Sequence, residues 1–259
     1  MEQIPGENWK NKDFVIKAVK NNGLSLVSAS KKLRNNKEVV LEAVKNNGMC
    51  LVYASEELQN DKEIILEAVK NNGNSLWYAS NELKNDKEVV LDAVKNDGYS
   101  LLYTSIEIRS IKEIVLEAVK NYGNALKFAS KELQDDEEIV LNSIKNGIQN
   151  LKYGSKNLRN NKNFIRKAIK IGPRSLKYAF DNIRNDENIV YEAIKIDGYC
   201  LKYASEKLQN NKRLTIIALK NIDFLNYSAF IRNNYKICQY DLYLFTLPFK
   251  KWNKILEFF

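Results

Sequence analysis

The sequence predicts an all-α solenoid of tandem two-helix repeats, with a period of 25 residues and a C-terminal cap. Three columns of residues in one unbroken register support this prediction, because repetition at a fixed period of this size is typical of solenoids. The leucine column is Leu26, Leu51, Leu76, Leu101, Leu126, Leu151, Leu176 and Leu201. The small-residue column is Ala18, Ala43, Ala68, Ala93, Ala118, Ser143, Ala168, Ala193 and Ala218. The glycine column is Gly23, Gly48, Gly73, Gly98 and Gly123, followed less regularly by Gly147, Gly172 and Gly198.

The repeats divide the 259 residues into three parts. Residues 1–11 form an N-terminal lead-in, and residues 12–232 form a helical repeat array of eight full repeats and a degraded ninth. Residues 233–259 form an aromatic-rich C-terminal cap, since a solenoid must cover the apolar face of its last repeat. The alternative for this tail is an amphipathic anchor on a membrane or a protein. Its apolar side would be Phe249, Trp252, Leu256 and Phe259, and its basic side Lys250, Lys251 and Lys254.

The first helix of each repeat is exemplified by the stretch Asp61–Gly73, DKEIILEAVKNNG. We expect Asn60 to cap its N-terminus while the Glu63 side chain reaches back, as in a capping box. The same pairs recur as Asn35/Glu38, Asn85/Glu88, Ser110/Glu113 and Asp135/Glu138. The apolar side chains cover so wide an arc that the helix must pack between neighbouring copies. Gly73 is expected at the left-handed position after the helix, which favours glycine.

The second half of the repeat, NSLWYASNELKN from Asn74, is predicted to form another short helix. On this helix Leu76, Ala79 and Leu83 share one face, and residue 77 points roughly the opposite way. The alternative is a break after Ser80, with Ser80 capping a separate turn.

The pattern of Glu38–Gly48, EVVLEAVKNNG, followed by Leu51–Asp61, LVYASEELQND, resembles the repeat family known as domain of unknown function 4116. The resemblance covers about residues 12 to 232, because several columns recur together in fixed register. It implies a helical repeat array, and it implies no established activity, cofactor or catalytic residue.

Residues that carry catalysis or metal binding are sparse. The chain has no histidine, which removes the commonest general base and metal ligand. Its three cysteines lack zinc spacing, and its glycines form neither a P-loop nor a dinucleotide motif. Two columns of acidic residues recur in the repeats, one that includes Glu63 and one that includes Glu67. Helix capping explains the first column, and a solvent-exposed helix face explains the second. We therefore expect no enzyme, no cofactor, no metal and no small-molecule substrate.

Cysteine usage and the absence of apolar runs predict an intracellular protein. An odd number of cysteines is typical of a reducing compartment, and Cys50 and Cys200 occupy a column of small residues with Ser25, Ser75, Ser100 and Ser175. Cys238 lies in the tail as a potential free thiol. The N-terminus shows no apolar signal-peptide core, and no run reaches the length of a membrane-spanning helix.

One outward column changes character along the chain, from apolar to basic. It contains Val27, Val52, Trp77 and Leu102, and then Lys127, Lys152, Lys177 and Lys202. An exposed apolar patch marks a partner site. The alternative is that a neighbouring turn buries these side chains.

Positive charge is concentrated in the second half. Residues 1–125 carry a net charge of −1 and residues 126–259 carry +10. Between Glu138 and Asp181 there are ten basic residues and no acid, including Arg166, Lys167 and Arg174. Such clustering raises the local potential and suits phosphate groups or an acidic partner. The alternative is an ordinary solvated face.

A tyrosine column also follows the period and is expected to pack at the edge of the core, with ligand stacking as the alternative. It comprises Tyr53, Tyr78, Tyr103, Tyr153, Tyr178 and Tyr203. Taken together, these features predict a non-catalytic scaffold that binds a protein or peptide partner. The alternative is binding to nucleic acid or an anionic lipid surface through the basic C-terminal half. The absence of aromatic residues interleaved with the ridge lysines weighs against recognition of single strands.

Overall fold

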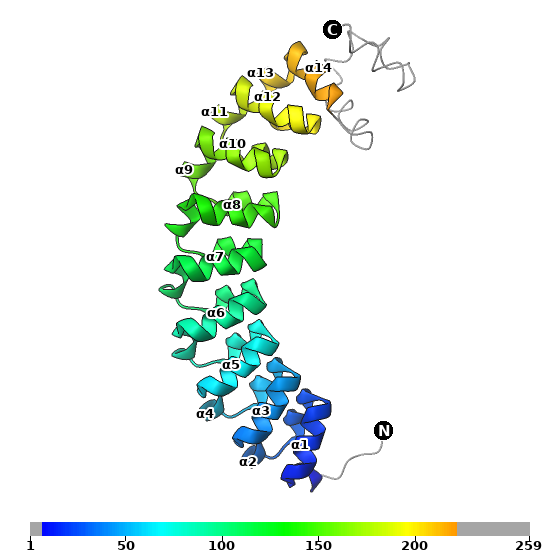
Figure 1. Cartoon of the computed structure of the whole chain (residues 1–259), viewed down its shortest axis with the longest axis vertical. Helices are drawn as coiled ribbons and strands as arrows, with labels where there is room; N and C mark the ends of the chain where they lie inside the picture. Colours follow the sequence, from blue (N-terminus) through cyan, green and yellow to red (C-terminus); the bar gives the residue numbers. More distant parts are fainter. Residues whose placement is uncertain (1–6, 222–259) are drawn as a thin grey trace, which may run out of the picture. The chain divides into compact units, whose positions relative to one another are not determined.

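The computed structural model describes residues 7–221, and within this range the chain is helical throughout, with no strand (Figure 1). The predicted all-α repeat class is thereby confirmed. Contacts group the chain into two compact units, an N-terminal unit that ends at Asn146 and a C-terminal unit that begins at Gly147. The C-terminal cap or anchor, Cys238 and the end of the ninth repeat lie outside the described residues.

Each repeat begins with an α-helix of nine or ten residues, as the sequence predicts. A short 3₁₀ helix, η1 (Asn8–Lys10), precedes the first one. In the N-terminal unit the long helices are α1 (Lys12–Asn21), α3 (Lys37–Asn46), α5 (Lys62–Asn71), α6 (Lys87–Asn96), α7 (Lys112–Asn121) and α8 (Glu137–Lys145). In the C-terminal unit they are α10 (Lys162–Ile171), α12 (Glu187–Ile196) and α14 (Lys212–Lys220).

The second half of each repeat opens with a six-residue 3₁₀ helix. These are η2 (Gly23–Ser28), η3 (Gly48–Tyr53), η4 (Gly73–Tyr78), η6 (Gly98–Tyr103) and η8 (Gly123–Phe128) in the N-terminal unit. In the C-terminal unit they are η10 (Ile148–Tyr153), η11 (Pro173–Tyr178) and η12 (Gly198–Tyr203).

A separate short segment follows each 3₁₀ helix. Of the two alternatives for the second half of the repeat, the structure therefore contains the break at Ser80 and not one continuous helix. The Ser80 hydroxyl accepts a hydrogen bond from the backbone N–H of Leu83 at 3.3 Å. The short segments are α2 (Lys31–Arg34), α4 (Glu56–Gln59), η5 (Leu83–Asn85), η7 (Ile108–Ser110) and η9 (Leu133–Asp135) in the N-terminal unit. In the C-terminal unit they are α9 (Lys156–Arg159), α11 (Asp181–Arg184) and α13 (Glu206–Gln209).

The helix caps lie one residue later than the sequence analysis expects. Asp61 rather than Asn60 caps α5, and its carboxylate accepts from the backbone N–H groups of Glu63 and Ile64 at 3.0 and 3.3 Å. Asn60 instead accepts from the Ser80 hydroxyl at 2.5 Å. The predicted capping boxes are therefore wrong in register, and Ser110 does not cap α7, because Ile111 occupies that cap position without a side-chain bond.

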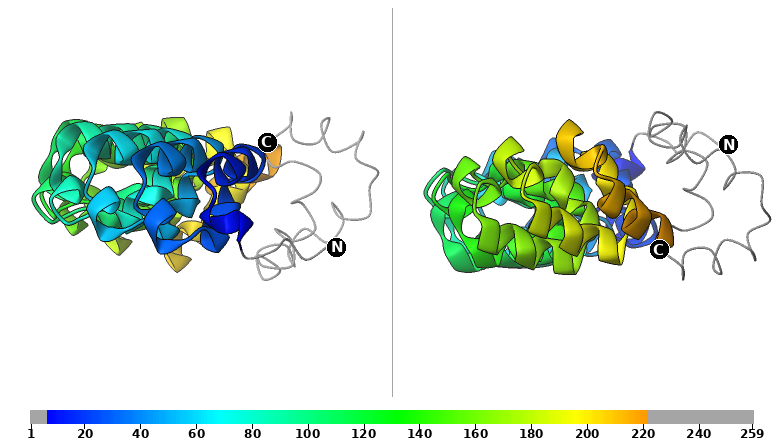
Figure 2. Two further views of the ribbon diagram at one scale, coloured as in Figure 1. Left: turned by 90° about the horizontal axis from the view of Figure 1, so that it is seen from below. Right: turned by 90° about the horizontal axis from the view of Figure 1, so that it is seen from above.

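Within each unit the repeats stack as two layers. Consecutive long helices contact each other from α1 to α8, and consecutive 3₁₀ helices contact each other from η2 to η8. The C-terminal unit repeats this arrangement with α10, α12 and α14 and with η10, η11 and η12. In the end views of Figure 2 the helices of the first unit superpose as two rows. The core between the rows is aliphatic, with Ile64, Ile65, Val69 and Leu76 buried in the third repeat.

An asparagine at the end of α3, α5, α6 and α7 links consecutive repeats of the N-terminal unit. The Asn71 side chain accepts from the backbone N–H of Gly48 at 2.7 Å and donates to the Lys45 carbonyl at 3.0 Å. Asn46, Asn96 and Asn121 make the same pair of bonds to their preceding repeats. We call these side chains the asparagine ladder. In the C-terminal unit this position holds Ile171 and Ile196, and Asn221 donates to the Ile217 carbonyl of its own helix, so the ladder does not continue there.

The glycines are required by close approach and not by a left-handed backbone, which corrects the expectation for Gly73. A Cβ atom at Gly73 would lie 2.4 Å from the Ala93 carbonyl oxygen of the next repeat. Gly48 and Gly98 meet the equivalent carbonyls of Ala68 and Ala118 at 2.3 and 2.2 Å. Among the described residues, a positive φ occurs at Gly147 alone, with a value of 151°.

Lysine residues at the start of the long helices form a second set of links. The Lys37 ammonium pairs with Asp61 at 2.7 Å and with Glu63 at 2.8 Å in the next repeat. Lys62 and Lys112 repeat the arrangement with Asp86 and Glu88 and with Asp136 and Glu138. Glu63, Glu88 and Glu138 thus pair with a lysine of the preceding repeat, whereas the sequence analysis expects such a glutamate to fold back on its own cap.

In four of the described repeats a long side chain donates to carbonyls at the end of the 3₁₀ helix. Gln134 donates to the Leu126 carbonyl at 3.3 Å and to the Ala129 carbonyl at 3.1 Å, and Arg109 donates to the Leu102 carbonyl at 2.5 Å. Because a helix end leaves such carbonyls without intrahelical partners, these glutamine and arginine side chains complete the hydrogen bonding there. No helix in residues 7–221 combines the length and the apolar character that crossing a membrane requires.

Candidate partner-binding surface

The predicted apolar ridge runs along the 3₁₀ layer of the N-terminal unit. Val27, Val52 and Trp77 occupy the fifth position of η2, η3 and η4, and their side chains are 51, 40 and 57% exposed. The column therefore faces solvent at these three repeats. Leu102 differs from the expectation, because it is half-buried at the same position of η6.

The 3₁₀ geometry explains why these side chains point outward. In η4 the residues Gly73, Ser75 and Leu76 are buried against the long helices, so Trp77 falls on the open side. Residues three apart lie above one another in a 3₁₀ helix, which places position 74 on the same side as position 77.

Leu24 belongs to this surface and was missed by the sequence analysis. It lies three residues before Val27 in η2, and its side chain is 43% exposed. Its column continues as Met49, Asn74, Tyr99 and Asn124. The varied composition of this column was the available signal, since a position that packs in the core would keep one type of residue. We call Leu24, Val27, Val52 and Trp77 the apolar ridge from here on.

Five aromatic rings form a continuous cluster at the end of the apolar ridge. The Trp77 ring packs edge-on against Tyr103 at 5.2 Å between centroids, and Tyr103 packs against Tyr99 at 5.9 Å. Tyr99 also contacts Tyr122 at 6.0 Å and Phe128 at 5.6 Å. Tyr99 and Tyr122 did not stand out in the sequence because neither belongs to the tyrosine column. We call these five residues the aromatic cluster.

Two lysines lie over the aromatic cluster. The Lys84 nitrogen is 5.6 Å from the centroid of the Trp77 ring, and burial lowers the pKa of Lys84. The Lys127 nitrogen is 4.6 Å from the Phe128 ring and 5.8 Å from the Tyr99 ring. These distances suit cation–π attraction, which holds an ammonium against a ring without neutralising its charge.

Pairing between repeats neutralises part of the predicted basic cluster. Arg166 pairs with Glu192 at 2.9 Å, and Arg174 pairs with Asp197 at 2.8 Å. Each acid lies more than 20 residues further along the chain, so a count of charges within the basic stretch does not include it. Both arginines must be removed from the basic patch, while Lys167 remains exposed on α10.

The remaining basic column of the C-terminal unit lies against aromatic rings, which corrects the expectation that none accompany it. Lys152 lies 4.7 Å from the Tyr153 ring and Lys177 lies 5.5 Å from the Tyr178 ring. Lys202 lies 4.9 Å from Tyr203 and 3.6 Å from Tyr199. The tyrosine column is half-buried at every described repeat, so its rings pack at the edge of the core and still keep an open edge.

In the described range the two cysteines are buried and the acids form no metal-binding cluster. Cys50 and Cys200 are buried free thiols, and burial raises the pKa of each to about 12. A thiol with so high a pKa stays protonated and is a poor nucleophile. Residues 7–221 contain no cluster of acidic or cysteine side chains suited to a metal ion.

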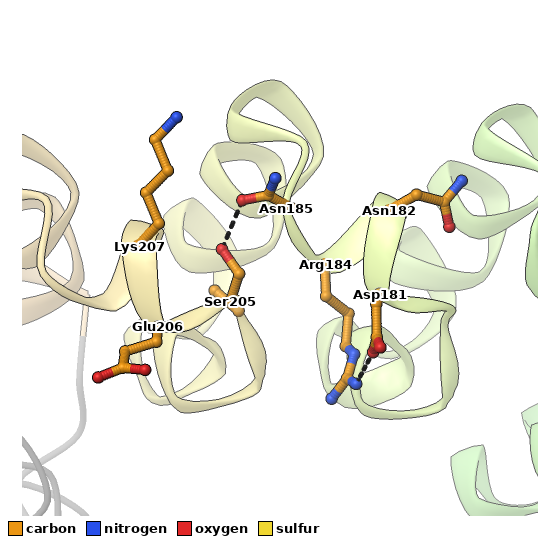
Figure 3. Close-up of a pocket in the computed structure, with 8 residues that line it drawn as sticks. Asp181, Asn182, Arg184, Asn185, Ser205, Glu206 and Lys207 are labelled. Atoms are coloured by element: carbon orange, nitrogen blue, oxygen red, sulfur yellow. Dashed lines mark hydrogen bonds and ion pairs between the residues drawn. The ribbon is translucent and has the colours of Figure 1, made fainter.

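A groove lies between α11 and α13 in the C-terminal unit (Figure 3). Its volume is about 670 Å³, and most of its lining residues are polar or charged. Ser205 donates to Asn185 across it at 2.7 Å, and Arg184 pairs with Asp181 of its own turn. The groove is the space between two consecutive short segments, and the Arg184–Asp181 pair lies within one of them. The lining residues are Asp181, Asn182, Arg184, Asn185, Ala204, Ser205, Glu206 and Lys207.

Comparison with known families identifies the repeat. The model of the family described as "Domain of unknown function (DUF4116)" matches residues 11–59, 61–109, 111–153, 136–184 and 186–239. Each match covers about two of the 25-residue repeats, and two matches overlap at residues 136–153, where the two compact units meet in the sequence. No curated protein and no solved structure matches the chain.

Proposed function

The chain belongs to the DUF4116 family of domains of unknown function, and from the surface that its repeats carry we propose that it is a non-catalytic scaffold that binds a protein or peptide partner. The observation that supports this proposal is the apolar ridge, where Leu24, Val27, Val52 and Trp77 are between 40 and 57% exposed on consecutive 3₁₀ helices. Contiguous exposed apolar side chains are typical of interaction surfaces.

The side chains of the apolar ridge are not needed to fill the core of the fold. The core beneath it is filled by Leu26, Leu51 and Leu76, which are buried in the same 3₁₀ helices. A partner that covers the ridge would gain about 25 cal/mol for each Å² of apolar surface removed from water. Trp77 is the expected anchor, because tryptophan is enriched among the residues that dominate interface energy.

A pull-down from lysate of the source cells, with and without nuclease, tests this proposal. The bait is the whole chain as wild type, as Trp77→Glu and as Lys95→Glu, a charge-reversal control on the exposed side of α6. We expect a nuclease-resistant partner that the wild type and the control retain and that Trp77→Glu loses. A partner retained equally by all three baits would show that the apolar ridge is not the interface.

A second candidate function is favoured by the lysine–tyrosine pairs of the C-terminal unit. Lys152, Lys177 and Lys202 lie on three consecutive contacting 3₁₀ helices, and each has a tyrosine ring beside it. In the described part of the chain none of the three makes an ion pair with an acid. Regularly placed ammonium groups with neighbouring rings suit the phosphate backbone of a nucleic acid, and an anionic lipid surface would use the same charges.

We also propose an intracellular location. The support is the odd number of cysteines and the unpaired state of Cys50 and Cys200, since extracellular proteins oxidise such thiols to disulfides.

A further inference from the structure

Lys84 and Lys127 are uncompensated charges at the aromatic cluster. Neither makes an ion pair with any residue in the range 7–221, whereas Lys37, Lys62 and Lys112 each pair with two acids of the next repeat. Lys84 is already half-buried, and its ammonium lies 5.6 Å from the exposed ring of Trp77. The apolar ridge therefore ends in two cations that the protein itself does not neutralise.

A partner that covers Trp77 must also remove water from Lys84, because the two groups are in contact. Desolvating an unpaired ammonium opposes binding more strongly than burial of one aromatic ring favours it, unless a counter-charge is supplied. A carboxylate on the partner supplies this counter-charge. The attraction between the carboxylate and the ammonium becomes stronger as water leaves the interface. The same reasoning applies to Lys127 at the Phe128 ring, although Lys127 is more exposed.

The order of the rings sets the length of the segment that can bridge the two lysines. From Trp77 through Tyr103 and Tyr99 to Phe128 the centroids are 5.2, 5.9 and 5.6 Å apart. Lys84 lies at the Trp77 end of this series and Lys127 at the Phe128 end. An extended chain advances about 3.3 Å per residue, so at most about five residues separate the two ends.

We propose that the partner bound by the apolar ridge is a peptide segment in which acidic residues flank a short apolar stretch. Its apolar side chains cover Trp77 and the neighbouring rings, and its carboxylates pair with Lys84 and Lys127. This inference rests on the proposed function and specifies the chemistry of the partner. A phosphate backbone fits this surface less well, because the first part of the ridge consists of Leu24, Val27 and Val52, with no cation among them.

Selection from a random peptide library displayed on phage tests the inference with the intact chain as target. The targets are the wild type, Lys84→Gln/Lys127→Gln, Trp77→Ala, and Lys70→Gln/Lys95→Gln as a control with the same loss of charge on the α-helical layer. Peptides enriched on the wild type are expected to carry Asp or Glu beside aromatic or aliphatic residues. A selected peptide is then synthesised with its acids and with the corresponding amides, and both forms are titrated by fluorescence polarisation.

We expect the Lys84→Gln/Lys127→Gln variant to bind the acidic peptide at least tenfold more weakly, while the control pair binds it unchanged. Replacing the acids by amides should cost the wild type a similar factor and the double variant little, because the interaction is shared between the two charges. Circular dichroism melting of each variant separates loss of binding from loss of folding.

The contrary outcomes distinguish the two levels of the proposal. Selected peptides without acids, whose binding Trp77→Ala abolishes, would overturn the inference and leave the proposed function standing. Failure to select any peptide, or binding that Trp77→Ala leaves intact, would overturn the proposed function itself. Binding of a single-stranded oligonucleotide that depends on Lys84 and Lys127, in place of an acidic peptide, would assign this surface to a different ligand and overturn the inference.

Discussion

The side-chain oxygen of Asn71 accepts a hydrogen bond from the backbone N–H of Gly48, with 2.7 Å between the two atoms and 23 residues between them in the sequence. The Asn71 amide nitrogen also donates to the Lys45 carbonyl at 3.0 Å. One side chain therefore satisfies the hydrogen bonding of two backbone groups in the preceding repeat. Each step of the asparagine ladder therefore joins one repeat to the next through main-chain atoms, and repeats bonded in this way depend on their neighbours for stability.

The asparagine ladder yields a first prediction. Asn71→Ala leaves the half-buried N–H of Gly48 and a carbonyl without partners, and we expect it to lower the free energy of unfolding by about 1–3 kcal/mol in urea denaturation. Asn21→Ala is the matched control, since Asn21 ends the first long helix and its side chain bonds to nothing in residues 7–221. Equal losses at both positions would show that helix-end propensity, and not the ladder, determines stability.

The glycine column yields a second prediction. A Cβ at Gly73 would lie 2.4 Å from the Ala93 carbonyl and 2.9 Å from the Ser100 hydroxyl, so we expect Gly73→Ala to cost about 1–3 kcal/mol through overpacking. Gly73→Asn should cost at least as much, because its side chain is larger. A left-handed backbone would predict the reverse order, since asparagine tolerates that conformation better than alanine. Unfolding midpoints of the two variants decide between these explanations.

The charged caps yield a third prediction, on pH. The Lys162 ammonium lowers the pKa of Asp186, and burial opposes it. Burial alone would raise the pKa of Asp61, but Lys37 and the backbone N–H of Ile64 lower it below its usual value of 3.8. A folded-state pKa below the unfolded value gives stability that is complete above about pH 4 and is lost as the pH falls through the folded pKa.

We therefore expect the urea midpoint to fall between pH 4 and pH 2, and to fall less when Asp61, Asp86, Asp136 and Asp186 are changed to asparagine. Asparagine is an equally good N-cap, and Asn36 and Asn161 already occupy this position in the chain, so the exchange isolates the charge from the cap. The control Asp92→Asn removes an acid that makes no ion pair in the described range. An unchanged pH profile in the fourfold variant would contradict the assignment.

Adjacent residues of η4 yield a fourth prediction, on which side chains of the 3₁₀ helix face the core and which face solvent. Leu76 is buried and Trp77 is 57% exposed. Leu76→Ala should cost about 2–5 kcal/mol because it opens a cavity in the core. Trp77→Ala should cost about 1 kcal/mol or less, as expected for an exposed position away from the core. If the two substitutions destabilise equally in thermal and urea unfolding, the apolar ridge is part of the core and cannot serve as an interface.

The lysine–tyrosine pairs yield a fifth prediction, for the second candidate function. If Lys152, Lys177 and Lys202 neutralise phosphates, the affinity for single-stranded DNA or RNA should fall steeply with salt and show no sequence preference. Changing the three lysines to glutamate should weaken binding and flatten the salt dependence, as measured by fluorescence anisotropy. The same change at Lys45, Lys70 and Lys95 of the α-helical layer should have much less effect. Equal losses from both sets would mean that only net charge matters, and no binding at low salt would refute this function.

The repeat unit could be predicted well because its signals are local. The apolar face of Ile64, Ile65, Ala68 and Val69 and the outward position of Trp77 follow from spacing along one helix, and the structure places them as expected. The cap at Asp61 could not be separated from one at Asn60, because two neighbouring side chains with similar hydrogen-bonding groups both suit a helix N-terminus. The choice depends on Ser80, which bonds to Asn60 from the next repeat.

The candidate site was predictable only in part. Val27, Val52 and Trp77 were found from their column, but the aromatic cluster joins Trp77 to Tyr99 through Tyr103, and these rings meet only when the 3₁₀ helices stack. The ten basic residues between Glu138 and Asp181 suggested one charged patch. Pairing with acids of the following repeat removes Arg166 and Arg174 from it.

The sequence by itself determined the period, the helical class and the buried column of leucines, because each depends on residues within one turn or one helix of each other. Only the tertiary structure decided why the glycines are needed, which charges remain uncompensated and which rings meet. These properties arise mainly between groups about 20 to 29 residues apart in the sequence, at distances that depend on how closely consecutive repeats pack. The Ala93 carbonyl oxygen lies 2.4 Å from where a Cβ of residue 73 would be, and this contact shows how closely consecutive repeats pack. That packing distance cannot be read from the residues within one repeat.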